Sequence, residues 1–142
     1  MEKSSCIVYL LASSLFSIGV ALQVFLAGMV VVALEMGWSY HRDLGHGLAF
    51  PLLVMLVTVY LGHMPRRTKW LTWLLFIVFA IQADVLIFLR SSLPVLSAFH
   101  PVLALVDIVL AVMLVYQAWN SVREQRSVNQ YRRKSGPQTR II

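Results

Sequence analysis

The chain has 142 residues, of which 59% are hydrophobic and only 13% are charged. This length suits one domain, but soluble domains carry about twice this share of charged residues, roughly a quarter. Extensive disorder is excluded by the high hydrophobicity, and a disulfide-rich scaffold is excluded by the single cysteine, Cys6. The net charge of +6 suggests nucleic-acid binding, but the basic residues stand between and after long apolar runs. We therefore predict an integral membrane protein with no nucleic-acid partner.

Four apolar segments have the roughly 20 residues that a helix needs to cross a bilayer. In chain order they cover about residues 7–34, 44–62, 70–89 and 101–119. None alternates like a β-barrel strand, and helices satisfy their own backbone hydrogen bonds in lipid. We predict an all-α, four-helix transmembrane domain over residues 1–119, with a kink at Pro51. Residues 120–142 are polar and basic, and we expect a disordered tail lying against anionic lipid headgroups.

Lysine and arginine residues are distributed unequally between the two ends of the predicted helices. Ten lie at one end: Lys3, Arg66, Arg67, Lys69, Arg123, Arg126, Arg132, Arg133, Lys134 and Arg140. Only Arg42 and Arg90 lie at the other end. Short cytoplasmic loops are rich in Lys and Arg. We therefore predict a multi-pass protein of the cell inner (plasma) membrane with both termini in the cytoplasm.

The two halves of the predicted domain align when one is offset by 59 residues. Ala21-Leu22-Gln23 then matches Ala80-Ile81-Gln82, and a histidine follows each glutamine after eighteen residues, at His41 and His100. A repeat of two helices keeps its direction in the membrane, so an axis along the membrane normal relates the halves. The predicted bundle is thus built from two parallel two-helix repeats. His41 and His100 are expected at one depth, facing each other at the outer ends of the second and fourth helices.

Small residues accompany both histidines. Gly45 and Ala104 stand four residues after His41 and His100, so each lies one turn further on the same helix face and leaves room for a flat group. Two facing imidazoles above such a space suggest one haem iron with two axial histidine ligands. Neutral imidazole binds metals strongly, and bundle cores commonly hold such cofactors.

Other polar residues at this end support the haem hypothesis or leave alternatives to it. Arg42 and Arg90 are candidates to bind the haem propionates, because arginine pairs with carboxylates. A zinc site is one alternative, since Glu35, Asp43 and His46 lie on the same side and zinc takes three or four protein ligands. In another alternative, the two repeat-related histidines only cap helix ends and bind lipid headgroups.

The run Tyr40-His41-Arg42-Asp43-Leu44-Gly45 resembles the histidine-arginine helix start of the haem A synthase family. Residues 75–113 are similar as well, with a glutamine in the third helix and His100 at the start of the fourth. In that family each half is a four-helix bundle with one histidine on its second helix and one on its fourth. This chain is similar to one half over about residues 22–115, and a group of small four-helix bacterial membrane proteins shares the pattern. The resemblance implies that His41 and His100 ligate one b-type haem near the outer surface.

The chain departs from that family at one informative position. The oxidising half of the synthases carries a carboxylate one helical turn before its first ligand, where this chain has Trp38. Glu35 is six residues before His41 and lies on a different face. The resemblance therefore implies haem binding without haem hydroxylation. An eight-helix assembly would need a homodimer or another subunit.

Asp84 and Asp107 are the acids well inside the predicted spans. Such residues are costly in lipid and usually face the bundle interior or water. We expect them to hold helices together through hydrogen bonds with groups such as Gln23, Gln82 or Thr58. The alternative is proton transfer to or from a quinone-like substrate beside the haem.

These features predict a membrane electron-transfer protein that holds one haem b as a small subunit of a redox complex. The expected partners are the lipid bilayer and other redox subunits or a second copy of the chain, with a quinone as a further candidate. An accessory or electron-transfer role is favoured over a stand-alone enzyme. The alternative function is a haem-free structural or assembly subunit of a membrane complex.

Overall fold

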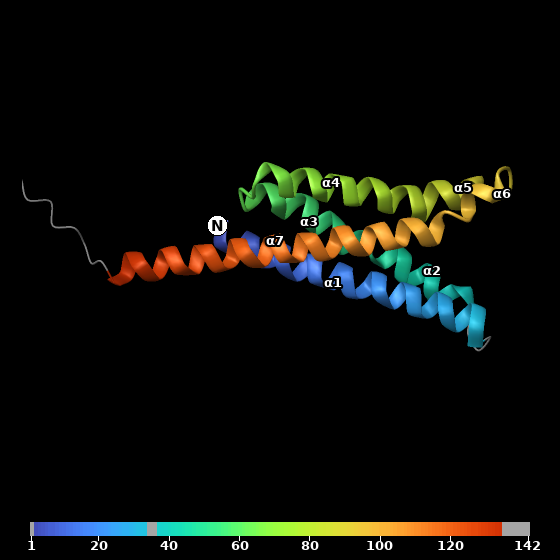
Figure 1. The fold of residues 1–142 in the computed structure, drawn as a ribbon, viewed down its shortest axis with the longest axis horizontal. Helices are drawn as coiled ribbons and strands as arrows, with labels where there is room; N and C mark the ends of the chain where they lie inside the picture. The colour runs from blue at the N-terminus through green and yellow to red at the C-terminus, as the bar shows by residue number, and fades with distance from the viewer. Residues whose placement is uncertain (1, 34–36, 135–142) are drawn as a thin grey trace, which may run out of the picture.

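The computed structural model describes residues 2–33 and 37–134, and these form long helices without any strand (Figure 1). The first half contains α1 (Glu2–Gly28), the π-helix η1 (Met29–Ala33), α2 (Trp38–Gly47) and α3 (Ala49–Leu61). The second half contains α4 (Arg66–Ala80), the π-helix η2 (Ile81–Val85), α5 (Leu86–Leu89), α6 (Pro94–Ser97) and α7 (His100–Lys134).

Four helical segments in this part of the chain are long and apolar enough to cross a membrane. They cover Ser4–Ala33, Trp38–Leu61, Arg66–Val85 and Pro94–Val128. Their outward faces carry large apolar side chains such as Leu11, Phe50 and Val109, each more than half exposed, which is the surface that lipid covers. The prediction of an all-α, four-helix membrane protein is confirmed, whereas its internal repeat stays a prediction.

The second span begins earlier than predicted. We expected it to start at Leu44, but α2 starts at Trp38, so His41 lies in the first turn of a helix. The span is interrupted at Leu48, between α2 and α3. Pro51 explains the interruption, because it has no N–H to donate to the carbonyl of Gly47 four residues earlier.

The fourth span continues well past the predicted end at residue 119, because α7 runs to Lys134. Val122 is 3% exposed and belongs to the apolar core. Gln125 donates from Nε2 to Sγ of Cys6 at 3.4 Å, which joins this extension to the beginning of α1. The expectation of a disordered tail from residue 120 is therefore corrected as far as residue 134. Residues 135–142 of that predicted tail lie outside the described part of the chain.

The helices pack as a four-membered bundle in which α1 contacts α3 and α7, and α4 contacts the same two helices. We call the end near the N-terminus and the last turns of α7 the terminal end. The opposite end, with α2, α5 and α6, is the histidine end (Figure 1). Side-chain hydrogen bonds join helices in the terminal half. Tyr9 Oη and Thr72 Oγ1 form a buried bond of 2.6 Å, and Thr68 Oγ1 donates a partly buried bond of 2.7 Å to Gln117 Oε1.

Packing is uneven along the bundle. Most fully buried apolar side chains, such as Phe16, Leu75 and Leu114, lie in the middle and terminal half. At the histidine end, α2, η1 and α6 contain no buried residue. Figure 1 shows α1 and α2 diverging from α4 and α5 toward this end. The candidate site therefore lies where the two helix pairs separate.

Candidate functional site

The two histidines of the predicted repeat lie close together at the histidine end of the bundle. His41 lies in the first turn of α2, and His100 is the first residue of α7. Their ring centroids are 6.0 Å apart, and the ring planes are inclined by 66°. Both side chains are partly buried. The structure thus brings together the two residues that the sequence predicted to face each other.

Each imidazole is oriented by a backbone carbonyl on the preceding helix. His41 Nδ1 lies 3.1 Å from the carbonyl oxygen of Gln23, and His100 Nδ1 lies 3.2 Å from that of Gln82. A carbonyl only accepts hydrogen bonds, so each Nδ1 carries the hydrogen and each neutral ring has its lone pair on Nε2. The two contacts match under the 59-residue offset, although the full repeat is not established by them.

A π-helical turn accompanies the acceptor of His100. In η2 the N–H of Leu86 donates to the carbonyl of Ile81, five residues earlier. An α-helix would direct that N–H to the carbonyl of Gln82, four residues earlier. The π-turn relieves the Gln82 carbonyl of that bond and leaves it available to the His100 ring. Single π-turns of this kind occur often at functional sites.

The spacing of the rings suits two ligands of one metal. Two nitrogens on opposite sides of one metal, each bonded to it at about 2.0–2.1 Å, lie about 4 Å apart. Adding roughly 1 Å from each nitrogen to its ring centroid puts the centroids roughly 6 Å apart, and the observed separation is 6.0 Å. Metal-binding histidines usually donate their other N–H to a carbonyl or carboxylate, as His41 and His100 do here.

The space beside Gly45, which we expected to be open for a flat group, is occupied by the side chain of Gln23. A Cβ atom at this position would lie 2.7 Å from Nε2 of Gln23. The absence of a side chain at Gly45 thus makes room for the Gln23 amide in this structure. Ala104, the predicted counterpart on α7, is partly buried. The Gln23 amide is the far end of a flexible side chain, so this space changes with one rotamer.

A buried polar pair lies below His100 on the same helix. Asp107 is fully buried, and its Oδ2 accepts a hydrogen bond of 2.7 Å from Nε2 of Gln82. This bond joins the third and fourth spans, as the helix-linking hypothesis for Asp107 expected. Within the described chain, Asp107 Oδ1 and the Oε1 atoms of Gln82 and Gln23 are buried without hydrogen-bond partners. Asp84, in contrast, is exposed on the bundle surface.

The predicted propionate partners lie at the surface. Arg42 is 66% exposed and its Nε is 3.4 Å from Oδ1 of Asp43, so a neighbouring acid already engages it. Arg90 is exposed near the end of the third span. Trp38 contacts the His41 ring edge-on, with centroids 5.5 Å apart. Trp38 therefore packs against one of the two candidate ligands.

The part of the chain that the structure describes contains no group of side chains that could hold zinc, as the zinc alternative requires. No cluster of three or more His, Cys, Asp or Glu side chains occurs there. His46 is exposed on α2. Glu35, the other proposed ligand, lies outside the described residues. The two-histidine site remains the arrangement to explain.

Sequence reasoning used Gln23 and Gln82 only to set the register of the repeat. It missed that their backbone carbonyls orient the two imidazoles. The signal was present as the shared spacing of eighteen residues, which places each histidine one helix hairpin after its glutamine. The π-turn at Ile81–Val85 had no clear signal, because its residues do not differ in kind from those of an ordinary apolar helix.

Residues 23–87, slightly less than half of the chain, match a family described as "Family of unknown function (DUF6220)". The matched part contains Gln23, His41 and Gln82 but ends before His100 and Asp107. No curated protein and no solved structure matches the chain.

Proposed function

We propose that this protein is a membrane b-type haem protein in which His41 and His100 are the two axial ligands. The observation that carries the proposal is the matched orientation of the rings. Each Nδ1 is hydrogen-bonded to a backbone carbonyl, and the centroids of the two imidazole rings are 6.0 Å apart. The fixed tautomer leaves Nε2 of both rings as ligand atoms.

The residues around the histidines assist ligation in distinct ways. The Gln23 and Gln82 carbonyls accept hydrogen bonds from the imidazoles and hold the rings in place. Trp38 packs against the edge of His41 and restricts its ring. Arg42 and Arg90 are the cations available for the propionates at this end, with the Arg42 guanidinium already facing Asp43.

Haem supplies one-electron transfer when bound, and its potential depends on axial ligands, burial and nearby hydrogen bonds. With His41 and His100 as its ligands, a bound haem would supply electron transfer, and we propose this activity in preference to bond-making chemistry. The proposed partners reach the site within the bilayer, and they are another redox subunit, a second copy of the chain or a quinone. The Lys/Arg distribution favours a site on the outer side of the plasma membrane.

The alternative function is a haem-free structural or assembly subunit. The observation that favours it is the Gln23 amide beside Gly45, which already occupies space near the histidines. The sparse burial on α2 and α6 suits this alternative equally well, because a partner subunit would cover these helices.

A visible spectrum of the purified full-length protein distinguishes the two functions. We expect a reduced, six-coordinate b-type spectrum with one haem per chain, both from haem-supplied cells and after titration of the apoprotein with haem. A protein that stays colourless and shows no saturable haem binding would refute the proposal and favour the subunit role.

A further inference from the structure

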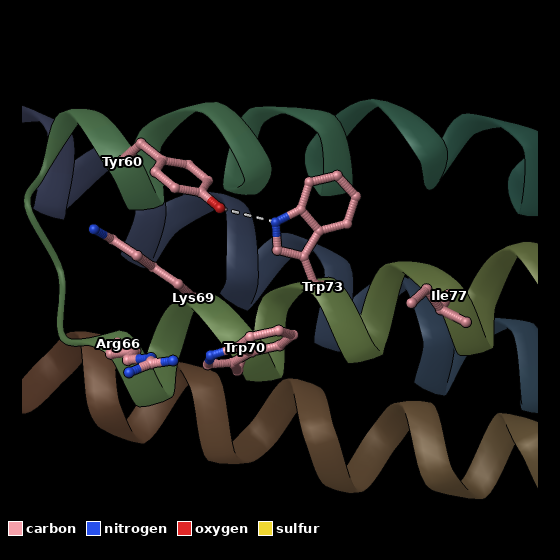
Figure 2. A pocket seen from close by; sticks show the side chains of 6 residues that line it. All are labelled: Tyr60, Arg66, Lys69, Trp70, Trp73 and Ile77. Atoms are coloured by element: carbon pink, nitrogen blue, oxygen red, sulfur yellow. Dashed lines mark hydrogen bonds between the residues drawn. The ribbon is translucent and has the colours of Figure 1, made fainter.

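A second site lies at the terminal end of the bundle, far along the helices from the two histidines. Tyr60 on α3 and five residues of α4 line a pocket of about 400 Å³ (Figure 2). The lining residues of α4 are Arg66, Lys69, Trp70, Trp73 and Ile77. We propose that this pocket binds one anionic phospholipid, with its phosphate among the cations and an acyl chain against the apolar wall.

The polar atoms of the pocket are hydrogen-bond donors. Trp73 Nε1 donates to Tyr60 Oη at 2.9 Å, so the Tyr60 hydroxyl keeps its own hydrogen for a further acceptor. Figure 2 shows the Trp73 indole directed toward Tyr60, with the Lys69 side chain extending beside the tyrosine ring. Arg66 and Lys69 add only N–H groups. A pocket of donors without an acid among its lining residues fits a ligand rich in acceptor oxygens and negative in charge.

The two cations also have no acidic partner among the residues that the structure describes. No salt bridge to Arg66 or Lys69 occurs within the described residues. Lys69 Nζ instead lies 5.0 Å from the centroid of the Tyr60 ring, a cation-π contact that positions the ammonium at the pocket. Arg66 is the first residue of α4, where the helix dipole adds partial positive charge. Each of these features increases the attraction for a phosphate.

The position of the pocket relative to the membrane favours a lipid over a soluble anion as its ligand. Leu61 ends the second span and Arg66 begins the third, so the pocket lies where tryptophan, tyrosine and basic residues meet lipid headgroups. Trp73 and Ile77 continue the wall along α4 into the span, and they are 40% and 50% exposed. An apolar wall that continues into the membrane fits an acyl chain attached to the bound phosphate.

Native mass spectrometry of the full-length protein tests the assignment by titration with phosphatidylglycerol and, separately, phosphatidylcholine of the same acyl chains. We expect phosphatidylglycerol to bind more tightly than phosphatidylcholine and to show one preferred site. Arg66→Gln combined with Lys69→Gln should weaken that binding by roughly 30-fold, because two cations that pair directly with the bound phosphate are lost. Glycerol 3-phosphate should not displace the lipid, since it lacks the acyl chain.

A matched variant separates this pocket from general charge attraction. Arg67→Gln combined with Arg123→Gln removes the same charge from exposed residues that do not line the pocket. It should weaken phosphatidylglycerol binding by less than about threefold, because screening limits exposed charges to short range. Equal losses in both double variants would overturn the proposal, as would equal affinity for phosphatidylcholine or displacement by glycerol 3-phosphate.

Discussion

Individual side chains at the histidine end combine two kinds of constraint. Backbone carbonyls fix the imidazoles of His41 and His100, whereas the Gln82 amide fixes the buried carboxyl group of Asp107. Gln82 contacts His100 through its backbone carbonyl and Asp107 through its side-chain amide. The orientation of the His100 ring and the polar pair below it are therefore connected through one residue.

The ligand assignment predicts different effects for the four histidines. His41→Ala or His100→Ala should each abolish the six-coordinate spectrum, because one axial bond is lost. His46→Ala and His63→Ala should leave it unchanged, since both side chains are exposed and neither belongs to the facing pair.

The four variants should all reach the membrane in similar amounts, because insertion depends on the apolar helices. Removing the second ligand from a single-ligand variant should cost little further haem, since residues acting as a unit are not additive. Loss of haem in His46→Ala with retention in His41→Ala would contradict the assignment.

Gln82→Leu should destabilise the protein by about 1–3 kcal/mol, because it leaves the buried Asp107 carboxyl group without its donor. Thermal unfolding in detergent, followed by circular dichroism, measures the effect. Replacing both residues with leucine should recover most of the loss, because no polar group is then left unsatisfied. A double variant no more stable than Gln82→Leu would show that the bond is not the cause.

At the scale of helices, close approaches decide which positions tolerate side chains. Gly19 on α1 faces the buried Leu48, and a Cβ at Gly19 would collide with Cδ2 of that leucine. Gly28, in the last turn of α1, has no atom within 4 Å of the equivalent position. Only Gly19 of these two glycines is needed for close packing. Small residues at helix interfaces often allow a neighbouring segment to approach the helix backbone in this way.

Gly19→Ala should destabilise the bundle by about 1–3 kcal/mol, because the added methyl group overpacks the contact between α1 and Leu48. Gly28→Ala should have no destabilising effect, since alanine favours helix over glycine. Thermal unfolding of both variants gives the comparison. Adding Leu48→Ala should cost less in the Gly19→Ala background than in the natural protein, and equal costs would exclude a direct collision.

The extension of α7 makes a second prediction at this scale. Val122 is 3% exposed and Val128 is 59% exposed on the same helix. Val122→Asp should destabilise the protein by about 2–4 kcal/mol because it buries a charge. Val128→Asp should have an effect within about 0.5 kcal/mol. Equal sensitivity of the two positions to aspartate, measured by thermal unfolding, would mean that residues beyond 119 do not pack on α1.

For the molecule as a whole, hydropathy was enough to predict four spanning helices, because lipid requires long apolar helical segments. The offset of 59 residues between the two halves was enough to predict that His41 and His100 lie close together. Helix ends were less predictable, since polar residues such as Asn120 and Arg123 do not prevent a helix from continuing. The contents of the space beside Gly45 depended on a rotamer of Gln23, which no spacing in the sequence determines.

The orientation of the whole bundle is open to direct measurement. The four spans alternate in direction, so the N-terminus and the last turns of α7 lie at the same end (Figure 1). Nine of the eleven Lys and Arg residues in the described part of the chain stand at that end, so the positive-inside rule predicts that this end lies in the cytoplasm. A reporter fused after Arg66 should therefore report the cytoplasm, and one fused after Arg90 should report the outside. Alkaline phosphatase, active only outside, and a fluorescent protein, active only inside, should give opposite signals at the two positions. The reverse pattern would put both histidines on the cytoplasmic side, and the proposed redox partners would then have to approach from there.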